Sequence, residues 1–127
     1  MLRVSDLDAS IAFYTDMLGM SELGRETFPD AKFTAVYIGY GDMATNTVLE
    51  LTYNWDYEGY EHGTAFGNIT LAVSDIYALE TFLKEQGVTI LRAAGELSIV
   101  PSETGKLYTL AHISLDPDGY RVELIKV

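Results

Sequence analysis

The sequence contains no cysteine and only two histidines among its 127 residues. The lack of cysteine excludes disulfides, thiolate metal ligands and a cysteine nucleophile. Any metal site must therefore use oxygen or nitrogen ligands, with few imidazoles to supply the nitrogen. His62 lies in a predicted loop and is interpreted as an ordinary exposed loop residue, whereas His112 lies in a predicted strand.

Basic residues are also scarce, with eight Lys and Arg against nineteen Asp and Glu, a net charge of -11 and a pI near 4.3. This balance argues against nucleic acid and anionic membranes as partners, because both are bound by clustered cations. No apolar run is long enough to cross a bilayer. We therefore expect a cytoplasmic protein that folds as one compact domain over residues 1–127.

Two segments of the chain occur twice. LRVSDL at 2–7 returns as LAVSDI at 71–76, and VLEL at 48–51 returns as RVEL at 121–124. Such self-similarity indicates a duplicated unit, with one module at about 1–60 and a second at about 61–127. The repeat places Glu50 and Glu123 in equivalent positions, and we expect both carboxylates to face one shared cavity.

Each module is predicted to contain a strand, a helix and three further strands. Asp6 and Asp75 supply N-caps for helices at 7–18 and from 76, which Gly19 and Gly87 end. Segments with period-two patterning predict the strands: 23–28, 32–40, 47–53, 68–73, 89–92, 108–115 and 120–127. The fold class is therefore α+β with two βαβββ modules. Residues 93–106 are interpreted mainly as a long loop of the kind that forms lids or binding segments.

Strand parity assigns a face to each candidate residue. If Leu49 and Leu51 pack under a helix, Glu50 points to the opposite, concave face, and Glu123 does the same in the second module. The same count places Arg3 and Asn68 on this face. A lone glutamate in a sheet is usually a solvent-facing residue, but two at equivalent positions of apolar strands favour a site.

DPDG at 116–119 is a strong turn signal between the last two strands. A loop of two or four residues pairs Leu115 with Tyr120, and counting outward places His112 opposite Glu123. His112 is therefore a candidate substitute metal ligand or charge partner. The alternative is a strand histidine that hydrogen-bonds to Glu123 or to water.

Several motifs at fixed mutual spacing carry a family resemblance: MLRV at 1–4, SIAFY at 10–14, LGM at 18–20, LELTYNW at 49–55, DPDGY at 116–120 and EL at 123–124. Over nearly its whole length the chain resembles glyoxalase I, lactoylglutathione lyase, of the vicinal oxygen chelate superfamily. The resemblance implies paired βαβββ modules and a homodimer with sites at the interface.

The resemblance also implies one divalent metal, nickel or zinc, held by two His and two Glu. Glu50 and Glu123 match the two Glu positions. One His position would precede Met1, and the other is occupied by Asn68. Carboxylate and amide oxygens suit harder cations, so a harder cation or no metal are the alternatives. A native start upstream of Met1 would explain the first missing ligand, and the short first strand favours it.

By resemblance, Arg3 and Asn54 match positions that hold the glutamyl end of glutathione, the co-substrate. Lys106 matches, less closely, a residue of a loop that closes over the thiol conjugate. An arginine fork suits a carboxylate in a protein poor in cations. The alternative for Arg3 is an ion pair with Glu50 or Glu123.

Two functions follow. The first is glyoxalase I-like isomerisation of a methylglyoxal–glutathione hemithioacetal to S-lactoylglutathione, with Glu123 as base and metal ligand and Glu50 as metal ligand. The second is metal-free binding or sequestration of a small molecule on the same fold, which the missing His positions favour. A ring-cleaving iron oxygenase of the same superfamily needs two His and one carboxylate, and Asn68 argues against it.

Overall fold

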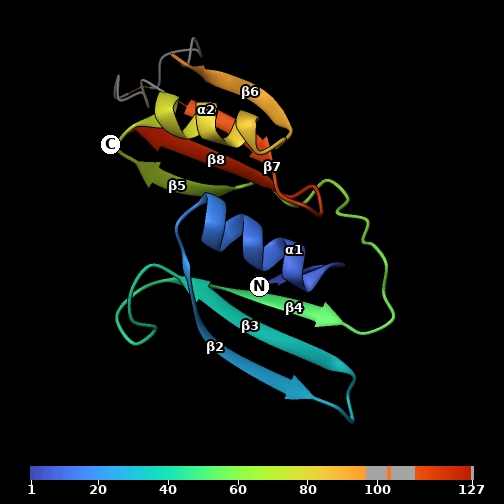
Figure 1. Ribbon diagram of the computed structural model, residues 1–127. Helices are drawn as coiled ribbons and strands as arrows, with labels where there is room; N and C mark the ends of the chain where they lie inside the picture. The colour runs from blue at the N-terminus through green and yellow to red at the C-terminus, as the bar shows by residue number, and fades with distance from the viewer. Residues whose placement is uncertain (97–102, 104–110, 127) are drawn as a thin grey trace. The chain divides into compact units, whose positions relative to one another are not determined.

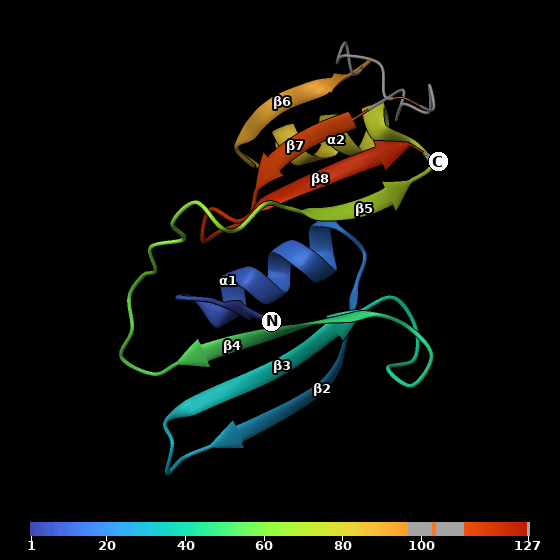
Figure 2. The ribbon, with the colours of Figure 1, turned by 180° about the vertical axis from the view of Figure 1, so that it is seen from behind.

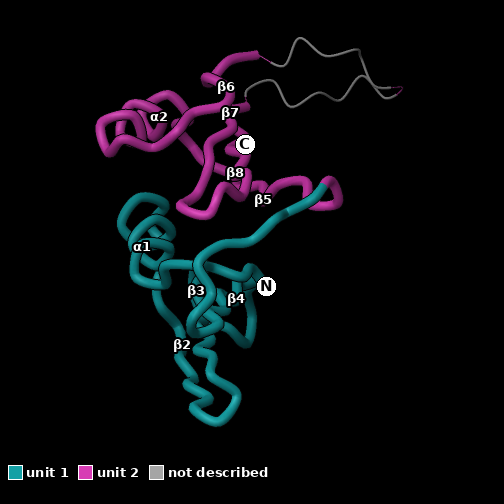
Figure 3. Tube along the Cα trace, turned by 90° about the vertical axis from the view of Figure 1, so that its right-hand side faces the viewer, with its two compact units in different colours: residues 1–63 teal, residues 64–127 magenta. Residues whose placement is uncertain are grey.

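The computed structural model describes residues 1–96, 103 and 111–126. The chain divides into two compact units, Met1–Gly63 and Thr64–Val127, shown in teal and magenta in Figure 3. Among the described residues, no helix is both long and apolar enough to cross a membrane. Each unit is built from one four-stranded sheet and its own helical segment.

The first unit begins with β1 (Leu2–Arg3), followed by α1 (Leu7–Ala12) and a π-helical turn, η1 (Phe13–Met17). Three strands complete it: β2 (Ser21–Phe28), β3 (Phe33–Gly39) and β4 (Val48–Asn54). The sheet order is β1-β4-β3-β2, and β1 is parallel to β4. The antiparallel strands β4, β3 and β2 lie side by side in Figure 1.

The second unit repeats this arrangement with β5 (Ile69–Val73), α2 (Ile76–Glu85), β6 (Ile90–Gly95), β7 (Ala111–Leu115) and β8 (Arg121–Lys126). Its sheet order is β5-β8-β7-β6, and only β5 and β8 are parallel (Figure 2). Both units therefore follow the order strand, helix, three strands, which confirms the predicted α+β class with two βαβββ modules.

The two sheets share their register as well as their strand order. In the first parallel pair Leu2 lies beside Leu51, and in the second Leu71 lies beside Leu124. Leu51 and Leu124 are both fully buried. Glu50 and Glu123 immediately precede these two leucines, so the sequence repeat is a structural repeat and each glutamate points away from the buried face of its strand.

The helix ends follow the chemistry expected from the sequence. Oδ1 of Asp6 accepts a hydrogen bond from the Ala9 N–H, and Oδ1 of Asp75 accepts one from the Ala78 N–H, each at 3.0 Å. Gly19 and Gly87 adopt φ of 75° and 78°, the left-handed conformation that ends a helix. One difference lies within the first helix, which widens into η1 after Ala12.

A second difference concerns the predicted long loop at 93–106. Strand β6 runs from Ile90 to Gly95, so the first part of this segment belongs to the sheet and the prediction was wrong there. Irregular pairing with β7, between Ile90 and Arg92 and again between Arg92 and Gly95, breaks the period-two pattern that would have identified the strand. Residues 97–102 and 104–106 lie outside the described residues.

Candidate active site

Glu123 in the second unit is the centre of a cluster of three polar side chains. Thr70 lies beside Glu123 in the parallel β5–β8 pair, and its Oγ1 donates a hydrogen bond to Glu123 Oε2 at 2.8 Å. Nδ2 of Asn68, just before β5, donates to the same Oε2 at 3.1 Å and to Thr70 Oγ1 at 2.8 Å. These contacts place Asn68 and Glu123 on one face of this sheet, as strand parity predicts.

Glu50 occupies the equivalent place in the first unit but has different neighbours. Its Oε1 accepts a hydrogen bond from Thr52 Oγ1, two residues along β4, at 3.5 Å. Arg3 lies beside Thr52 in the β1–β4 pair, so Arg3 shares the face of Glu50. Arg3 and Glu50 therefore lie on the same face of the first sheet, as strand parity predicts. Whether Glu50 and Glu123 face one cavity stays a prediction.

Arg3 and Asn54, the two predicted substrate-binding residues, line one hollow of about 550 Å³ in the first unit. Asn54 Nδ2 donates to the Tyr60 hydroxyl at 3.2 Å, which orients the amide. Tyr60 stacks parallel to Tyr57, with ring centroids 6.0 Å apart. The remaining lining residues are Ala31, Lys32 and Trp55. The hollow combines two cations, an amide and aromatic walls, which suits an anionic organic ligand.

Lys32 also lines this hollow, although no sequence motif pointed to it. It ends the β2–β3 turn with a φ of 55°, an uncommon conformation for a residue with a side chain. Its carbonyl accepts a hydrogen bond from the Trp55 N–H at 2.9 Å, which ties the turn to the end of β4. The scarcity of cations was the available signal, because each Lys or Arg in so acidic a chain merits attention as a ligand contact.

The predicted pairing of His112 with Glu123 was wrong. Leu115 pairs with Arg121, so that Leu124 lies opposite His112 and Ile113 lies opposite Glu123. The Asp116 N–H bonds to the Tyr120 carbonyl, which leaves a three-residue loop ending in Gly119 at a φ of 84°. An odd loop length shifts the register by one residue and moves His112 to the other face. His112 is therefore not positioned as a ligand beside Glu123.

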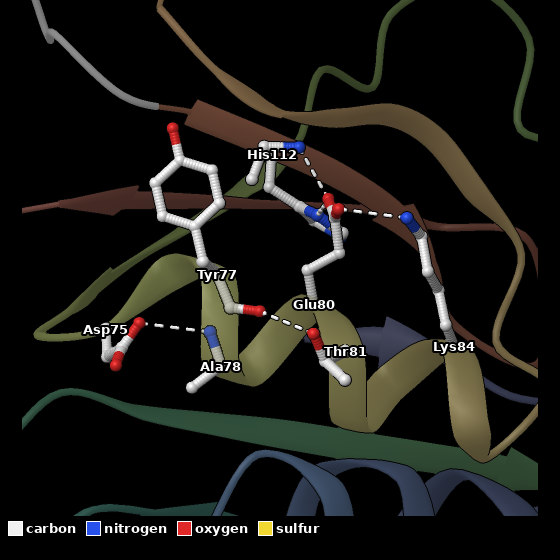
Figure 4. Close-up of polar contacts among 8 residues, drawn as sticks. Asp75, Tyr77, Ala78, Glu80, Thr81, Lys84 and His112 are labelled. Carbon is white, nitrogen blue, oxygen red and sulfur yellow. Dashed lines mark hydrogen bonds and ion pairs between the residues drawn. The ribbon is translucent and has the colours of Figure 1, made fainter.

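His112 instead packs against α2, fully buried, with its Nδ1 2.7 Å from Oε2 of Glu80 (Figure 4). Glu80 also accepts hydrogen bonds from the Ala94 N–H and, at 3.0 Å, from Lys84 Nζ. Burial by itself would raise the pKa of Glu80, but the bonds from Ala94, His112 and Lys84 outweigh it and lower the pKa to about 2. This cluster joins α2 to β6 and β7.

The side chains around the two glutamates do not fit the His and Glu ligand set that the resemblance implies. Among the described residues, no group of three or more His, Asp or Glu side chains could hold a metal ion. Glu123 has an amide and a hydroxyl beside it, and Glu50 has a hydroxyl. These are oxygen-rich surroundings without imidazole, which nickel and zinc sites normally include.

Two further sequence predictions have simple outcomes. Lys106 lies outside the described residues. His62 lies in the segment between β4 and β5, as predicted, but it is half-buried rather than exposed.

Comparison with known proteins defines the class to which this architecture belongs. Residues 1–124 match the family model of the glyoxalase, bleomycin resistance protein and dioxygenase superfamily, and the chain belongs to this superfamily. This agrees with the resemblance seen in the sequence motifs.

Among curated relatives, the lactoylglutathione lyase of Neisseria meningitidis serogroup A is 43% identical over 99% of this chain and 86% of its own length. The lactoylglutathione lyase of Haemophilus influenzae is also 43% identical, over 99% of this chain and 88% of its own length. The solved trypanothione-dependent glyoxalase I of Leishmania major superposes with a TM-score of 0.82 at 39% identity, over 99% of this chain and 82% of its own. Glyoxalase I from Zea mays superposes with a TM-score of 0.86 at 39% sequence identity over 97% of this chain, and this chain spans 41% of the maize protein.

Proposed function

We propose that this chain catalyses the glyoxalase I reaction, in which the hemithioacetal of methylglyoxal and glutathione isomerises to S-lactoylglutathione. The observation that supports this most strongly is the equivalence of Glu50 and Glu123. They hold the same register position in two repeated sheets of a chain 43% identical to a lactoylglutathione lyase. A solvent-facing role does not require that symmetry.

The hydroxyl and carbonyl groups of the hemithioacetal exchange places in the reaction, because the hydroxyl hydrogen ends on the former carbonyl oxygen. At the same time one proton moves from the carbon that bears sulfur to the neighbouring carbonyl carbon. One side chain can remove this proton and return it, so a single carboxylate is a sufficient base. We assign this role to Glu123. Its Oε2 is held by Asn68 and Thr70, whereas the described residues form no hydrogen bond with its Oε1. The second oxygen is thus the one that takes the proton.

The hollow in the first unit is our proposed anchor for the thiol conjugate. The Arg3 guanidinium and the Lys32 ammonium provide positive charge for the carboxylates of a peptide such as glutathione. Asn54 donates an amide hydrogen to the Tyr60 hydroxyl, which fixes the orientation of the amide group. Its Oδ1 can then accept a hydrogen bond from an ammonium group of the ligand. Binding the peptide part of the conjugate lowers the entropy cost of aligning the substrate.

Enzymes of the glyoxalase I type depend on a metal ion, which when bound would stabilise the negative charge that develops on the substrate oxygens. The described donors do not match the His and Glu set, so proton transfer and substrate anchoring are the only steps of the reaction that we assign to this chain's residues. Glu50 stays our candidate oxygen ligand, and its surroundings favour a hard cation over nickel or zinc.

Replacing Glu123 by Gln tests the proposed base directly. The substitution keeps the shape and removes the carboxylate, so kcat for hemithioacetal isomerisation should fall about 10²- to 10⁴-fold. Glu85→Gln is a matched control, because Glu85 is an exposed glutamate on α2. Equal turnover by the two variants would reject Glu123 as the base.

A second candidate function is sequestration of a small anionic molecule without chemistry. Asn68 stands at a position where the family has a histidine, and no imidazole lies beside Glu123 to bind a metal; both features favour sequestration. Binding of a ligand in the hollow requires no metal. The two functions differ in one measurement. A thiol conjugate that binds tightly to the protein and is recovered unchanged supports sequestration, and a conjugate recovered as the isomerised thioester supports catalysis.

A further inference from the structure

The Asn68–Thr70–Glu123 cluster forms a closed set of hydrogen bonds on the open face of the second sheet. Asn68 Nδ2 uses its two hydrogens on Thr70 Oγ1 and Glu123 Oε2, at 2.8 and 3.1 Å. The Thr70 hydroxyl donates a hydrogen bond to the same Oε2 at 2.8 Å. The Asn68 amide and the Thr70 hydroxyl therefore each give one hydrogen to the same carboxylate oxygen, and the other amide hydrogen joins Asn68 to Thr70.

The orientation of the Asn68 amide is dictated by its neighbours. If the amide were turned, its Oδ1 would face the Glu123 carboxylate, and two oxygens without a hydrogen between them would repel each other. The nitrogen must therefore face Glu123. A primary amide nitrogen carries hydrogens but no lone pair for a metal, whereas the imidazole of a histidine offers one.

The strands next to β8 supply Glu123 with no other polar contact among the described residues. Thr70 lies beside it on β5, and Ile113 lies opposite it on β7. The only nearby histidine in this sheet, His112, points to the other face and binds Glu80. The environment of Glu123 is therefore set by hydrogen-bond donors on one side and by an apolar side chain on the other.

We propose that Asn68 and Thr70 take the place of a metal ion in holding Glu123, so that this half of the molecule presents a hydrogen-bonded carboxylate instead of a metal–carboxylate pair. Asn68 and Thr70 are positioning residues in this scheme. That Glu123 acts as a base rests on the proposed function, but the way in which its carboxylate is held does not.

The test is a cobalt(II) titration of the full chain and its position-68 variants, followed by calorimetry and by the visible absorption of bound cobalt. Asn68→His supplies a nitrogen ligand and should tighten binding by about tenfold or more, with a new absorption band that Glu123→Gln abolishes in the double variant. The wild type and Asn68→Ala should show no Glu123-dependent band. A Glu123-dependent band in the wild type, or no gain in Asn68→His, would overturn the proposal.

A second measurement reports on the carboxylate itself. The ¹³C chemical shift of the Glu123 carboxylate should change in Asn68→Ala and Thr70→Val, which remove donors, and return toward the wild-type value in Thr70→Ser, which restores a hydroxyl. An unchanged shift in both donor-deleting variants contradicts the proposal. If no variant isomerises hemithioacetal, the proposed function fails while these two measurements still decide how Glu123 is held.

Discussion

Glu123 and Glu50 illustrate how equivalent residues acquire different surroundings after a duplication. Thr70, beside Glu123, has Met1 as its counterpart in the first unit, since Leu71 and Leu2 are equivalent in register. Among the described residues, Glu50 accepts a hydrogen bond only from Thr52 on its own strand, at the long distance of 3.5 Å. The shorter and more numerous bonds at Glu123 are the reason for assigning the base there.

At the same scale, Arg3 should contribute to substrate affinity through its fork of donors. Arg3→Lys keeps the charge and loses the bidentate geometry, and a charge-assisted hydrogen bond contributes about 1.5–3 kcal/mol. KM for the thiol conjugate should therefore rise about tenfold or more with kcat little changed. Steady-state kinetics measures both parameters.

Arg25→Lys is the matched control for Arg3. Arg25 is an exposed arginine on β2 that bonds to Glu22 and does not line the Arg3 hollow. If the two substitutions change KM equally, Arg3 has no special part in binding.

Among the elements, α2 is connected to two strands by one of its side chains. Glu80 connects the helix to β6 through the Ala94 N–H and to β7 through His112. The Ala94 N–H lies within the irregular part of the β6–β7 pairing, so a helix carboxylate satisfies a backbone donor that regular pairing would otherwise occupy. Loss of this carboxylate affects three elements at once.

The pH dependence of stability should report this contact. Because the folded pKa of Glu80 is lowered from 4.5 to about 2, the unfolded chain takes up the proton first as the pH falls. The stabilisation is complete above about pH 4.5 and is lost as the pH falls through that value toward 2. Its size at neutral pH is roughly 3 kcal/mol, since one pKa unit corresponds to about 1.4 kcal/mol.

Urea unfolding of the wild type and of Glu80→Gln, at neutral pH and at about pH 3, measures this contribution. The variant should be less stable at neutral pH by a margin that narrows at the lower pH. Glu85→Gln, on the same helix, is expected to change stability by less than about 0.5 kcal/mol. A margin that stays constant with pH would show that the Glu80 charge is not the cause.

Some features of the elements could be predicted from the sequence and others could not. The caps at Asp6 and Asp75 and the buried faces of Leu51 and Leu124 followed from local chemistry and strand parity, because both depend on residues a few positions apart. The position of His112 did not, because one residue in the length of the DPDG loop reverses its face. Glu80 gave no signal at all, since its partners at 94 and 112 are brought together only by tertiary packing.

Among the candidate site residues, those that belong to repeated or family motifs could be predicted from the sequence. Those that reach the site only through the folded geometry of the backbone could not. Arg3 and Asn54 were predicted and line one hollow, but Lys32 joins them through the geometry of a turn. Likewise, the face of Thr70 follows from strand alternation, whereas its bond to Glu123 depends on the parallel pairing of β5 with β8.

For the whole molecule, the glyoxalase I relatives lead us to propose a homodimer that binds the thiol conjugate. Sedimentation or light scattering across a range of protein concentrations measures the assembly, and we expect about twice the 14.1 kDa mass of the chain. A mass equal to one chain at all concentrations would contradict this expectation.

Glu123 is the proposed base of a hemithioacetal isomerase. The most direct test of this role measures turnover of the methylglyoxal–glutathione hemithioacetal by chelator-treated protein and after separate additions of nickel, zinc and manganese, for the wild type and Glu123→Gln side by side. We predict S-lactoylglutathione formation by the wild type in at least one of these conditions and a loss of about 10²- to 10⁴-fold in the variant. Absence of turnover by the wild type in every condition, or equal turnover by both proteins, would contradict the account.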